Sequence, residues 1–523
     1  MIFPILVALL LGIVYLFGGW ESIIENHNLE FYFLKKISIS FSLLLFALLW
    51  IIIIFMVTYS VFISVRKIRD QRLKTIIIGT FIFLIAFIIR CIFIMIYSKD
   101  LIPFSDFAAS WELAKGNYNE GNMSYYSLFP AYMNYSFFLN RVIFLFGDSF
   151  IVVLYINAIC CGMTATFLYL ITKEIIENEI TCIFVGALYT VYPSNFIYIT
   201  TATPDFIAVC FNTIGIYLLL KCIKSNSTLA TIILALFGGL SLGVGGSFKT
   251  YSVVMIIAFA IILIVLIILR KNDKHYNWSK MLTLIVLFTL TLFAYRYVTI
   301  ALSYSSSVYY DMVLSSKKAI PHYLLIGLNT EGEGQIHLGT LSRQYYQFYL
   351  SNGMNYENAK EYAYTLLSDD WHNNQNKIIP NFCKKMIWAW QDDYTPIRYF
   401  LNYVGIKPNT LMKGILYYYI ESYGAGITQI SYLLILTFAF IGSMFRIIKK
   451  EISISYEFVT LIVFGFFCMI FIIEGQSRYK CLVMPYVIIL SGVGIDAIIN
   501  KYGLILKKCW RIIINEKGYD NGG

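Results

Sequence analysis

Charged side chains are scarce in this sequence. Asp, Glu, Lys and Arg make up only 13% of the 523 residues, while hydrophobic residues make up 59%. Soluble proteins carry about a quarter charged residues, so a soluble fold is excluded. Apolar runs such as 75–97 and 251–269 are long enough to cross ~30 Å of hydrocarbon as helices. The sequence therefore predicts an all-α protein that crosses a membrane many times.

Several signatures of familiar chemistry are missing. Most of the ten cysteines fall within the apolar runs without metal-type spacing, so no disulfide framework is expected. The glycines of 238–246 lie inside an apolar run, do not fit a phosphate-binding loop, and favour close helix packing. No internal repeat or low-complexity tract is evident. The formal charge of +10 is explained by basic residues beside the spans rather than by nucleic-acid binding.

The apolar runs predict about twelve membrane spans. They are placed at 2–18, 39–64, 75–97, 149–172, 179–198, 205–222, 229–247, 250–269, 280–301, 426–445, 455–473 and 481–499. The first run lacks a basic leader and a small-residue cleavage site, so we interpret it as retained rather than as a signal peptide. Basic residues at 66–74, 270–280, 446–450 and in the tail predict that these loops and both termini are cytoplasmic.

Two long segments, 98–148 and 301–426, then face outward. The sequence suggests a two-helix membrane extension at the N-terminus, a membrane core, an extracytoplasmic juxtamembrane segment, C-terminal spans and a basic cytoplasmic tail. These parts are placed at 1–74, 75–301, 302–425, 426–500 and 501–523.

Ionisable residues gather at the predicted outer ends of the spans, where a charge is costly and its position informative. They are Arg90, Asp106, Asp205, Lys249, Arg296, Glu474, Arg478 and Lys480. Any one of them could simply snorkel or pair with another. Basic residues in short outer loops oppose the positive-inside tendency, however, so Lys249, Arg478 and Lys480 favour a bound phosphate such as that of a lipid carrier.

Asp106 is the carboxylate best placed for chemistry, because it follows a span directly and lies where a lipid-linked group would be; its alternative role is a helix N-cap. Glu112 ranks lower. A metal site would need the fold to gather His27, His322, His337 and His372. The acidic pairs at 369–370 and 392–393 could bind a divalent cation or could be solvated loop carboxylates.

Several motifs in chain order resemble the GT-C glycosyltransferases, in the branch of the protein O-mannosyltransferases and the lipid A aminoarabinose transferase. They are Arg90 with SDF at 105–107, the stretch YYSLFPAYMNYSFFLNRVIFLFGDS, YPS at 192–194 with PDF at 204–206, GGSFKTYS, and EGQSRYKCLVMPY. The resemblance covers 75–269 and returns at 471–495. The single Asp followed by Phe, and Lys-Thr in place of Arg-Pro, depart from the family pattern.

The resemblance implies sugar transfer from a polyprenyl-phosphate donor to a glycan, lipid or protein acceptor hydroxyl at the outer face of a plasma membrane, with inversion at the anomeric carbon. Asp106 would be the base; Arg90, Lys249, Arg296, Arg478 and Lys480 would bind the lipid phosphate. Supporting roles fall to Glu112, Tyr126, Asp205, Glu474 and Tyr479.

Three alternatives stay open: a flippase or transporter of lipid-linked sugars, a polymerase or ligase of lipid-linked oligosaccharides, and an inactive scaffold. Transporters place substrate charges near the midplane of the membrane and often show repeated halves. In this sequence the charges lie at the predicted outer ends of the spans, and no repeat is evident. The sequence establishes no cofactor, and it is compatible with a divalent cation.

Overall fold

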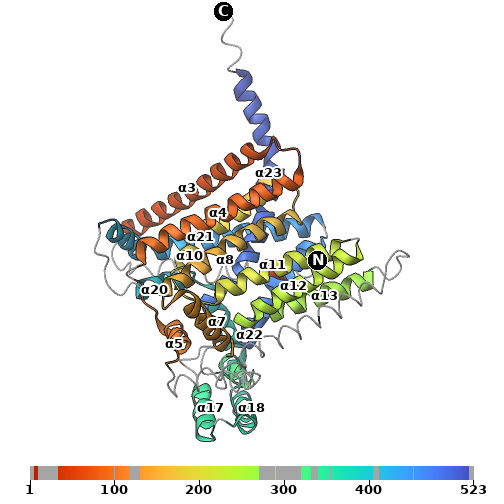
Figure 1. Ribbon diagram of the computed structural model, residues 1–523. Coiled ribbons are helices and arrows are strands. Elements are labelled where there is room, and N and C mark those ends of the chain that lie inside the picture. Colours follow the sequence, from red (N-terminus) through yellow and green to blue (C-terminus); the bar gives the residue numbers. More distant parts are fainter. Residues whose placement is uncertain are drawn as a thin grey trace, which may run out of the picture.

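The computed structural model of the protein is built from helices (Figure 1). It describes residues 5–9, 33–98, 101–117, 130–225, 227–269, 289, 320–330, 340–353, 355–403, 411–450 and 453–516. The main elements are α3 (Phe33–Val65), α4 (Gln71–Tyr97), α5 (Ser105–Ala114), α7 (Pro130–Phe146), α8 (Phe150–Lys173), α9 (Glu179–Val191), α10 (Pro193–Tyr198), α11 (Asp205–Lys224), α12 (Thr228–Phe248), α13 (Ser252–Leu269), α16 (Ile320–Leu328), α17 (Thr340–Ser351), α18 (Tyr356–Asn373), α19 (Gln375–Trp390), α20 (Thr395–Tyr403), α21 (Leu411–Lys449), α22 (Ile454–Ile472), the 3-10 turn η2 (Ser477–Tyr479) and α23 (Lys480–Glu516). The all-α prediction is confirmed.

Eight helices among the described residues are long and apolar enough to span a membrane, and two shorter apolar helices accompany them at Glu179–Val191 and Ser252–Leu266. The two remaining predicted spans, 2–18 and 280–301, lie almost wholly outside the described residues. The count of about twelve therefore stays a prediction.

One predicted span differs from the structure. The run 179–198 was expected to be a single helix, but α9 ends at Val191 and α10 begins at Pro193. Tyr192 between them has an extended backbone, with φ −62° and ψ 114°. Proline has no N–H to continue the hydrogen-bond ladder and disfavours a helical residue before it, so the chain breaks here.

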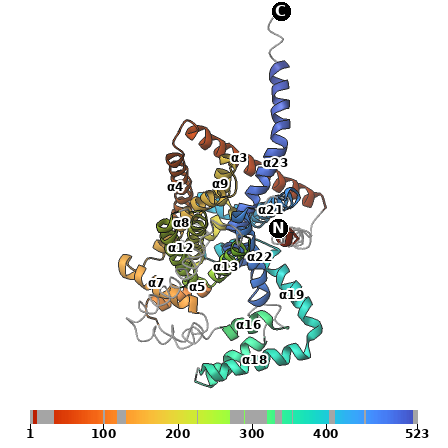
Figure 2. The ribbon, with the colours of Figure 1, turned by 90° about the vertical axis from the view of Figure 1, so that its right-hand side faces the viewer.

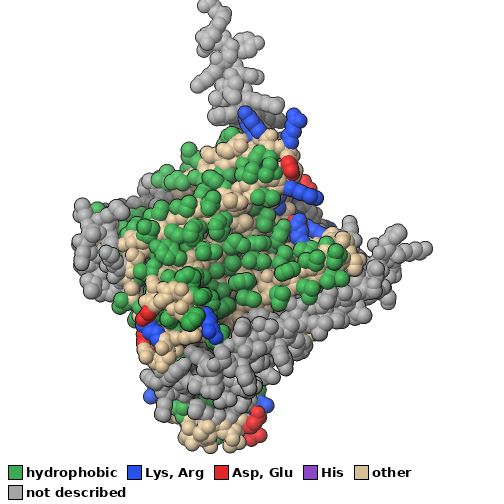
Figure 3. All heavy atoms as spheres, in the orientation of Figure 1, with side chains coloured by type: hydrophobic (Ala, Val, Ile, Leu, Met, Phe, Trp, Pro, Cys, Tyr) green, Lys and Arg blue, Asp and Glu red, His purple; other side chains and the backbone are tan. Residues whose placement is uncertain are grey.

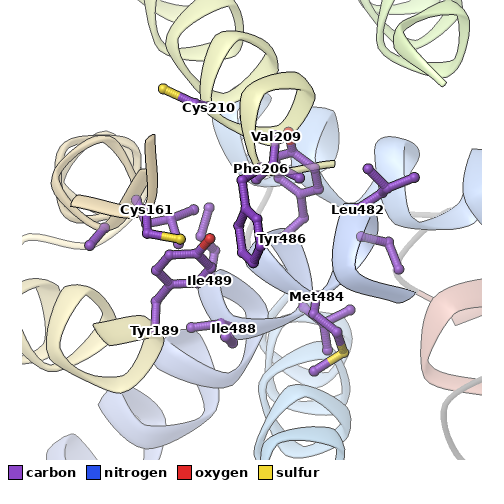
Figure 4. Packing of buried hydrophobic residues seen from close by; sticks show 14 of the residues in the cluster. Cys161, Tyr189, Phe206, Val209, Cys210, Leu482, Met484, Tyr486, Ile488 and Ile489 are labelled. Atoms are coloured by element: carbon purple, nitrogen blue, oxygen red, sulfur yellow. The ribbon is translucent and has the colours of Figure 1, made fainter. Parts of the chain in front are cut away.

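Helix α23 is central and α3 is peripheral. In an 18-residue stretch of the span Ser477–Lys501, which lies mostly in α23, 83% of the residues are buried, whereas only 17% are buried in Leu48–Val65 of α3. Figure 4 shows part of this core, with Tyr486 and Ile489 of α23 near Phe206 of α11 and Tyr189 of α9. The surface around this core carries a broad belt of apolar side chains (Figure 3). Such a belt suits contact with lipid.

Glycine permits the closest helix contacts. A Cβ on Gly245 of α12 would lie 2.2 Å from Asn212 Oδ1 of α11, and one on Gly494 of α23 would lie 1.9 Å from the Phe438 carbonyl oxygen of α21. The predicted packing role of the glycines at 238–246 is thus confirmed for Gly245.

One end of the bundle carries two groups of ion pairs. Lys74 and Lys173 lie 3.5 Å and 3.3 Å from Glu179, and Lys221 and Lys224 lie 2.6 Å and 2.8 Å from Glu174. Lys and Arg side chains also gather at this end in Figure 3. It is the end that the basic loops predict to be cytoplasmic.

The opposite end carries α5 and the helices α16–α20 (Figures 1 and 2). Lys385 of α19 joins this region to the bundle, since its buried Nζ donates to the carbonyl oxygens of Gly327 at 2.6 Å and Phe471 at 3.1 Å. Burial lowers the Lys385 pKa to about 7.

Two of the predicted boundaries between parts of the chain, at 425–426 and 500–501, fall inside the continuous helices α21 and α23.

Candidate active site

The ends of several helices meet on the α5 side of the bundle. Asp106 lies in the first turn of α5, Asp205 is the first residue of α11, and Lys249 is the C-cap of α12. A carboxylate at a helix start and a cation at a helix end are each favoured by the helix dipole. The connection from α22 to α23 adds Glu474 and Arg478.

Asp106 is the most accessible carboxylate of this group, with 26% of its side chain exposed. Its Oδ2 accepts a hydrogen bond from the Tyr132 hydroxyl at 3.3 Å and lies 3.5 Å from Nη1 of Arg478. Burial raises the pKa of Tyr132 well above its usual value, so this hydroxyl stays a donor. The preceding residue, Ser105, has φ 54°, a strained left-handed conformation of the kind that concentrates at functional sites.

Asp205 and Lys249 form a second, more buried pair. Lys249 Nζ lies 3.1 Å from Asp205 Oδ1, and the two side chains are 10% and 3% exposed. The other Asp205 oxygen accepts from the Tyr198 hydroxyl at 2.9 Å. Removing one member of such a pair would leave a buried charge and cost about 3–5 kcal/mol.

Tyrosine rings join the two ion pairs. The Tyr132 ring centroid lies 5.3 Å from Lys249 Nζ, and the Tyr479 ring centroid lies 5.8 Å from Lys249 Nζ and 5.4 Å from Arg478 Cζ. Tyr479 donates to Glu474 Oε2 at 2.7 Å, while Tyr399 accepts from Arg478 at 3.3 Å. The site thus presents an accessible carboxylate beside Arg478, with the buried Lys249 linked to it through Tyr132, which is an arrangement suited to a base and an anionic leaving group.

The structure brings together more than half of the predicted site residues. The members of this cluster are Asp106, Asp205, Lys249, Glu474, Arg478 and Tyr479. Three further members were not expected from the sequence: Tyr132, Tyr198 and Tyr399. Among 42 tyrosines, no local pattern distinguishes these three.

Among the described residues, three other predicted site residues, Glu112, Lys480 and Arg90, lie outside this cluster. Glu112 points away, pairing with Lys115 at 3.4 Å with 47% of its side chain exposed. Lys480 is buried against Asp393. Tyr126 and Arg296 lie outside the described residues.

Arg90 is fully buried in α4 and contacts backbone carbonyls. Its Nη1 donates to the Ala86 oxygen at 3.1 Å and its Nη2 to the Tyr189 oxygen at 3.5 Å, and its Cζ lies 5.8 Å from the Phe196 ring. Tyr189 belongs to the last turn of α9, whose carbonyls lack helical partners because the helix breaks before Pro193. Arg90 therefore caps the break between α9 and α10.

We expect Arg90→Met to destabilise the protein by about 1–3 kcal/mol, because a buried carbonyl loses its donor. The melting temperature in nanodiscs measures this, with the exposed Arg69→Met as the matched control. A normal melting temperature together with a raised KM for a lipid-phosphate donor would instead assign Arg90 to donor binding.

No group of three or more His, Cys, Asp or Glu side chains suited to a metal occurs within the described ranges. His322 is buried, which lowers its pKa to about 4, and His372 is exposed on α18; His27 and His337 lie outside those ranges. In the acidic pairs, Asp370 accepts from Thr330 and Asn374, and Asp393 faces Lys480. These two carboxylates thus have protein partners.

Comparison with known proteins shows which protein family this chain resembles. The family model for dolichyl-phosphate-mannose-protein mannosyltransferase matches residues 133–295, a range that includes Asp205 and Lys249. No curated protein matches the chain. Among solved structures, the crystal structure of the Archaeoglobus fulgidus oligosaccharyltransferase complex with Zn and sulfate matches with 12% identity and a TM-score of 0.35. The match covers 74% of this chain and 43% of that one, so the chain spans less than half of that protein's length.

The apolar helices indicate a multi-pass membrane protein. The resemblance over residues 133–295 supports a glycosyltransferase of the GT-C type.

Proposed function

We propose that this protein transfers a glycosyl group from a polyprenyl-phosphate-linked donor to an acceptor hydroxyl at the extracytoplasmic face of the plasma membrane. The observation that carries the proposal is the accessible Asp106 carboxylate beside Arg478, linked through Tyr132 to Lys249. The outer-face assignment is supported by the ion-paired, Lys-rich opposite end, which the positive-inside tendency places in the cytoplasm.

In the proposed reaction, the acceptor oxygen attacks the anomeric carbon and Asp106 takes its proton. The bond from that carbon to the phosphate oxygen breaks, and its electron pair leaves with the lipid phosphate. Arg478 and Lys249 stabilise the charge that develops on this phosphate. Their ion-pair partners, Asp106 and Asp205, hold the two cations in place before the donor binds.

An apolar groove next to the site suits the lipid part of such a donor. It has a cavity volume of about 520 Å³ and is lined by side chains of α3, α4, α10 and α21, among them Trp50, Ile92, Phe196 and Ile420. Helix α10 separates the groove from the charged cluster: Ile197 lines the groove, and the next residue, Tyr198, donates to Asp205. In this proposal, a donor with its phosphate at Lys249 and Arg478 passes around α10 to place its prenyl chain in the groove.

The test is an assay of the purified protein in lipid nanodiscs. Polyprenyl-phosphate sugars are supplied with and without acceptor, and free polyprenyl phosphate is measured. Acceptor-dependent release supports the proposal. Tight binding of diphosphate-linked oligosaccharides without release from any monophosphate donor would contradict it and favour a polymerase or flippase.

Filling the groove tests the lipid part of the donor. Ile92→Trp is expected to raise the KM for a long-chain donor about tenfold, which corresponds to about 1.4 kcal/mol of lost chain contact. The KM for a donor with a two-unit prenyl chain should stay unchanged, because that chain would not reach the obstructed part. Ile76→Trp is the matched control, since Ile76 is a 64% exposed residue on the same helix outside the groove lining. An equal rise for both donors would place the chain elsewhere.

A further inference from the structure

Lys480 is more deeply buried than Arg478 and Lys249, the two cations of the candidate site. It opens α23, two residues after Arg478, and only 2% of its side chain is exposed, against 12% for Arg478 and 10% for Lys249. Its Nζ lies 3.8 Å from Asp393 Oδ1 and 4.7 Å from the Tyr432 ring centroid. A phosphate bound beside Asp106 would meet Arg478 and Lys249, whereas Lys480 faces the protein interior.

Asp393, the partner of Lys480, is itself held in place. Its backbone N–H donates to Gln429 Oε1 of α21 at 2.9 Å, and its Oδ2 accepts from the hydroxyl of Tyr192, the residue between α9 and α10. Burial raises the Asp393 pKa to about 6, although Lys480 and Tyr192 favour its charged form. Asp393 is therefore held by three separate parts of the bundle, through its carboxylate to Tyr192 and Lys480 and through its backbone N–H to Gln429.

The segment that begins at Asp393 touches the site at further points. The hydroxyls of Thr395 and Ser477 are hydrogen-bonded, and the Tyr399 hydroxyl accepts from Arg478 Nη1 at 3.3 Å. Residues 393–399 thus contact the turn Ser477–Tyr479 and its neighbour Lys480 along their length. Within this contact, the Asp393 and Lys480 pair is the deeply buried part, with side chains 5% and 2% exposed.

We propose that Lys480 is a positioning residue: paired with Asp393, it fixes the Ser477–Tyr479 turn so that Arg478 faces Asp106, and it does not contact the donor phosphate. The proposal rests on the proposed function, in which Arg478 stabilises the leaving phosphate. It replaces the phosphate-binding role that the sequence suggested for Lys480.

A double-mutant cycle tests it. The variants are Asp393→Asn, Lys480→Gln and the two together, with Lys360→Gln as control, because Lys360 forms an exposed pair with Glu357 on α18. Transfer kinetics, polyprenyl-phosphate affinity and melting temperature are measured for each variant in nanodiscs. Lys480→Arg is added as the variant that keeps the charge.

Each single substitution leaves a buried charge unpaired, so we expect kcat to fall about tenfold or more while the donor KM changes by less than about threefold. In the double variant, two neutral amides can hydrogen-bond, and kcat should recover to within about threefold of wild type. Lys480→Arg should retain most activity, and the Lys360→Gln control should match wild type.

Other outcomes would overturn the proposal. A donor KM raised about tenfold or more in Lys480→Gln, with no recovery in the double variant, would make Lys480 a phosphate ligand. Wild-type kinetics in every variant would show that the pair positions nothing. If the wild-type protein neither transfers a sugar nor binds any lipid phosphate, the proposed function fails. The pair is then tested by melting temperature alone: additive changes in the double variant would show that positions 393 and 480 are not coupled, which would reject the pairing.

Discussion

Asp106→Asn is expected to lower transfer by about two to four orders of magnitude, the usual contribution of a general base. Asn keeps the shape of the side chain, and its amide oxygen can still accept from Tyr132 and lie beside Arg478. The protein should therefore fold normally and bind polyprenyl phosphate, but the acceptor proton would have no receiver. Acceptor-dependent release of polyprenyl phosphate in nanodiscs, with the melting temperature measured in parallel, checks both parts.

Glu112→Gln is the matched control for this prediction. Glu112 lies on the same short helix, α5, but it pairs with Lys115 at 3.4 Å and is 47% exposed. Its substitution should leave transfer within about twofold of wild type, as for a surface ion pair. Retention of full activity by Asp106→Asn, or an equal loss in both variants, would remove Asp106 from the role of base.

The membrane-spanning helices could be predicted from the sequence because the hydrocarbon layer accepts only long apolar segments. A span needs a long apolar run, and in the part of the chain that the structure describes eight such runs form long apolar helices. Charges at span ends are costly in lipid, so their positions indicated the site, and Asp106, Asp205, Lys249 and Arg478 do lie together. The break at Tyr192 was also detectable, since Pro193 lies inside the run that was taken as one helix.

Pairing between distant residues could not be predicted in this way. Arg478 and Asp106 are 372 positions apart, and the sequence around either residue does not identify the other as its partner. Lys480 and Arg478 have the same sequence context, yet one is buried against Asp393 and the other lies beside Asp106. Which cation faces the site depends on how the turn Ser477–Tyr479 is packed.

Arg90 was expected to bind the lipid phosphate, and that role stays a prediction. An arginine late in a span resembles a phosphate ligand, and its position relative to Asp106 fits the family pattern. In the structure its guanidinium contacts the Tyr189 carbonyl of the interrupted helix α9. A cation at that depth of a span can contact either a ligand or a backbone carbonyl. The sequence motif does not distinguish these two roles.

Arg478→Gln is expected to lower kcat by about 10²–10³, because a fixed donor facing a developing charge contributes most in the transition state. The guanidinium group touches Asp106 at 3.5 Å and Tyr399 at 3.3 Å, so it can stabilise the leaving phosphate while staying next to the base. Arg478→Lys keeps the charge but loses the planar fork, so its activity should fall between those of wild type and Arg478→Gln. Single-turnover rates at saturating donor measure the effect.

The exposed Arg398 of α20, next to Tyr399, offers the matched control: Arg398→Gln should retain wild-type rates. Because Arg478 and Asp106 touch, the double variant Asp106→Asn/Arg478→Gln should lose less than the product of the two single losses. Strictly multiplicative losses would show that the two side chains act independently. A raised donor KM with an unchanged kcat in Arg478→Gln would instead assign Arg478 to donor binding.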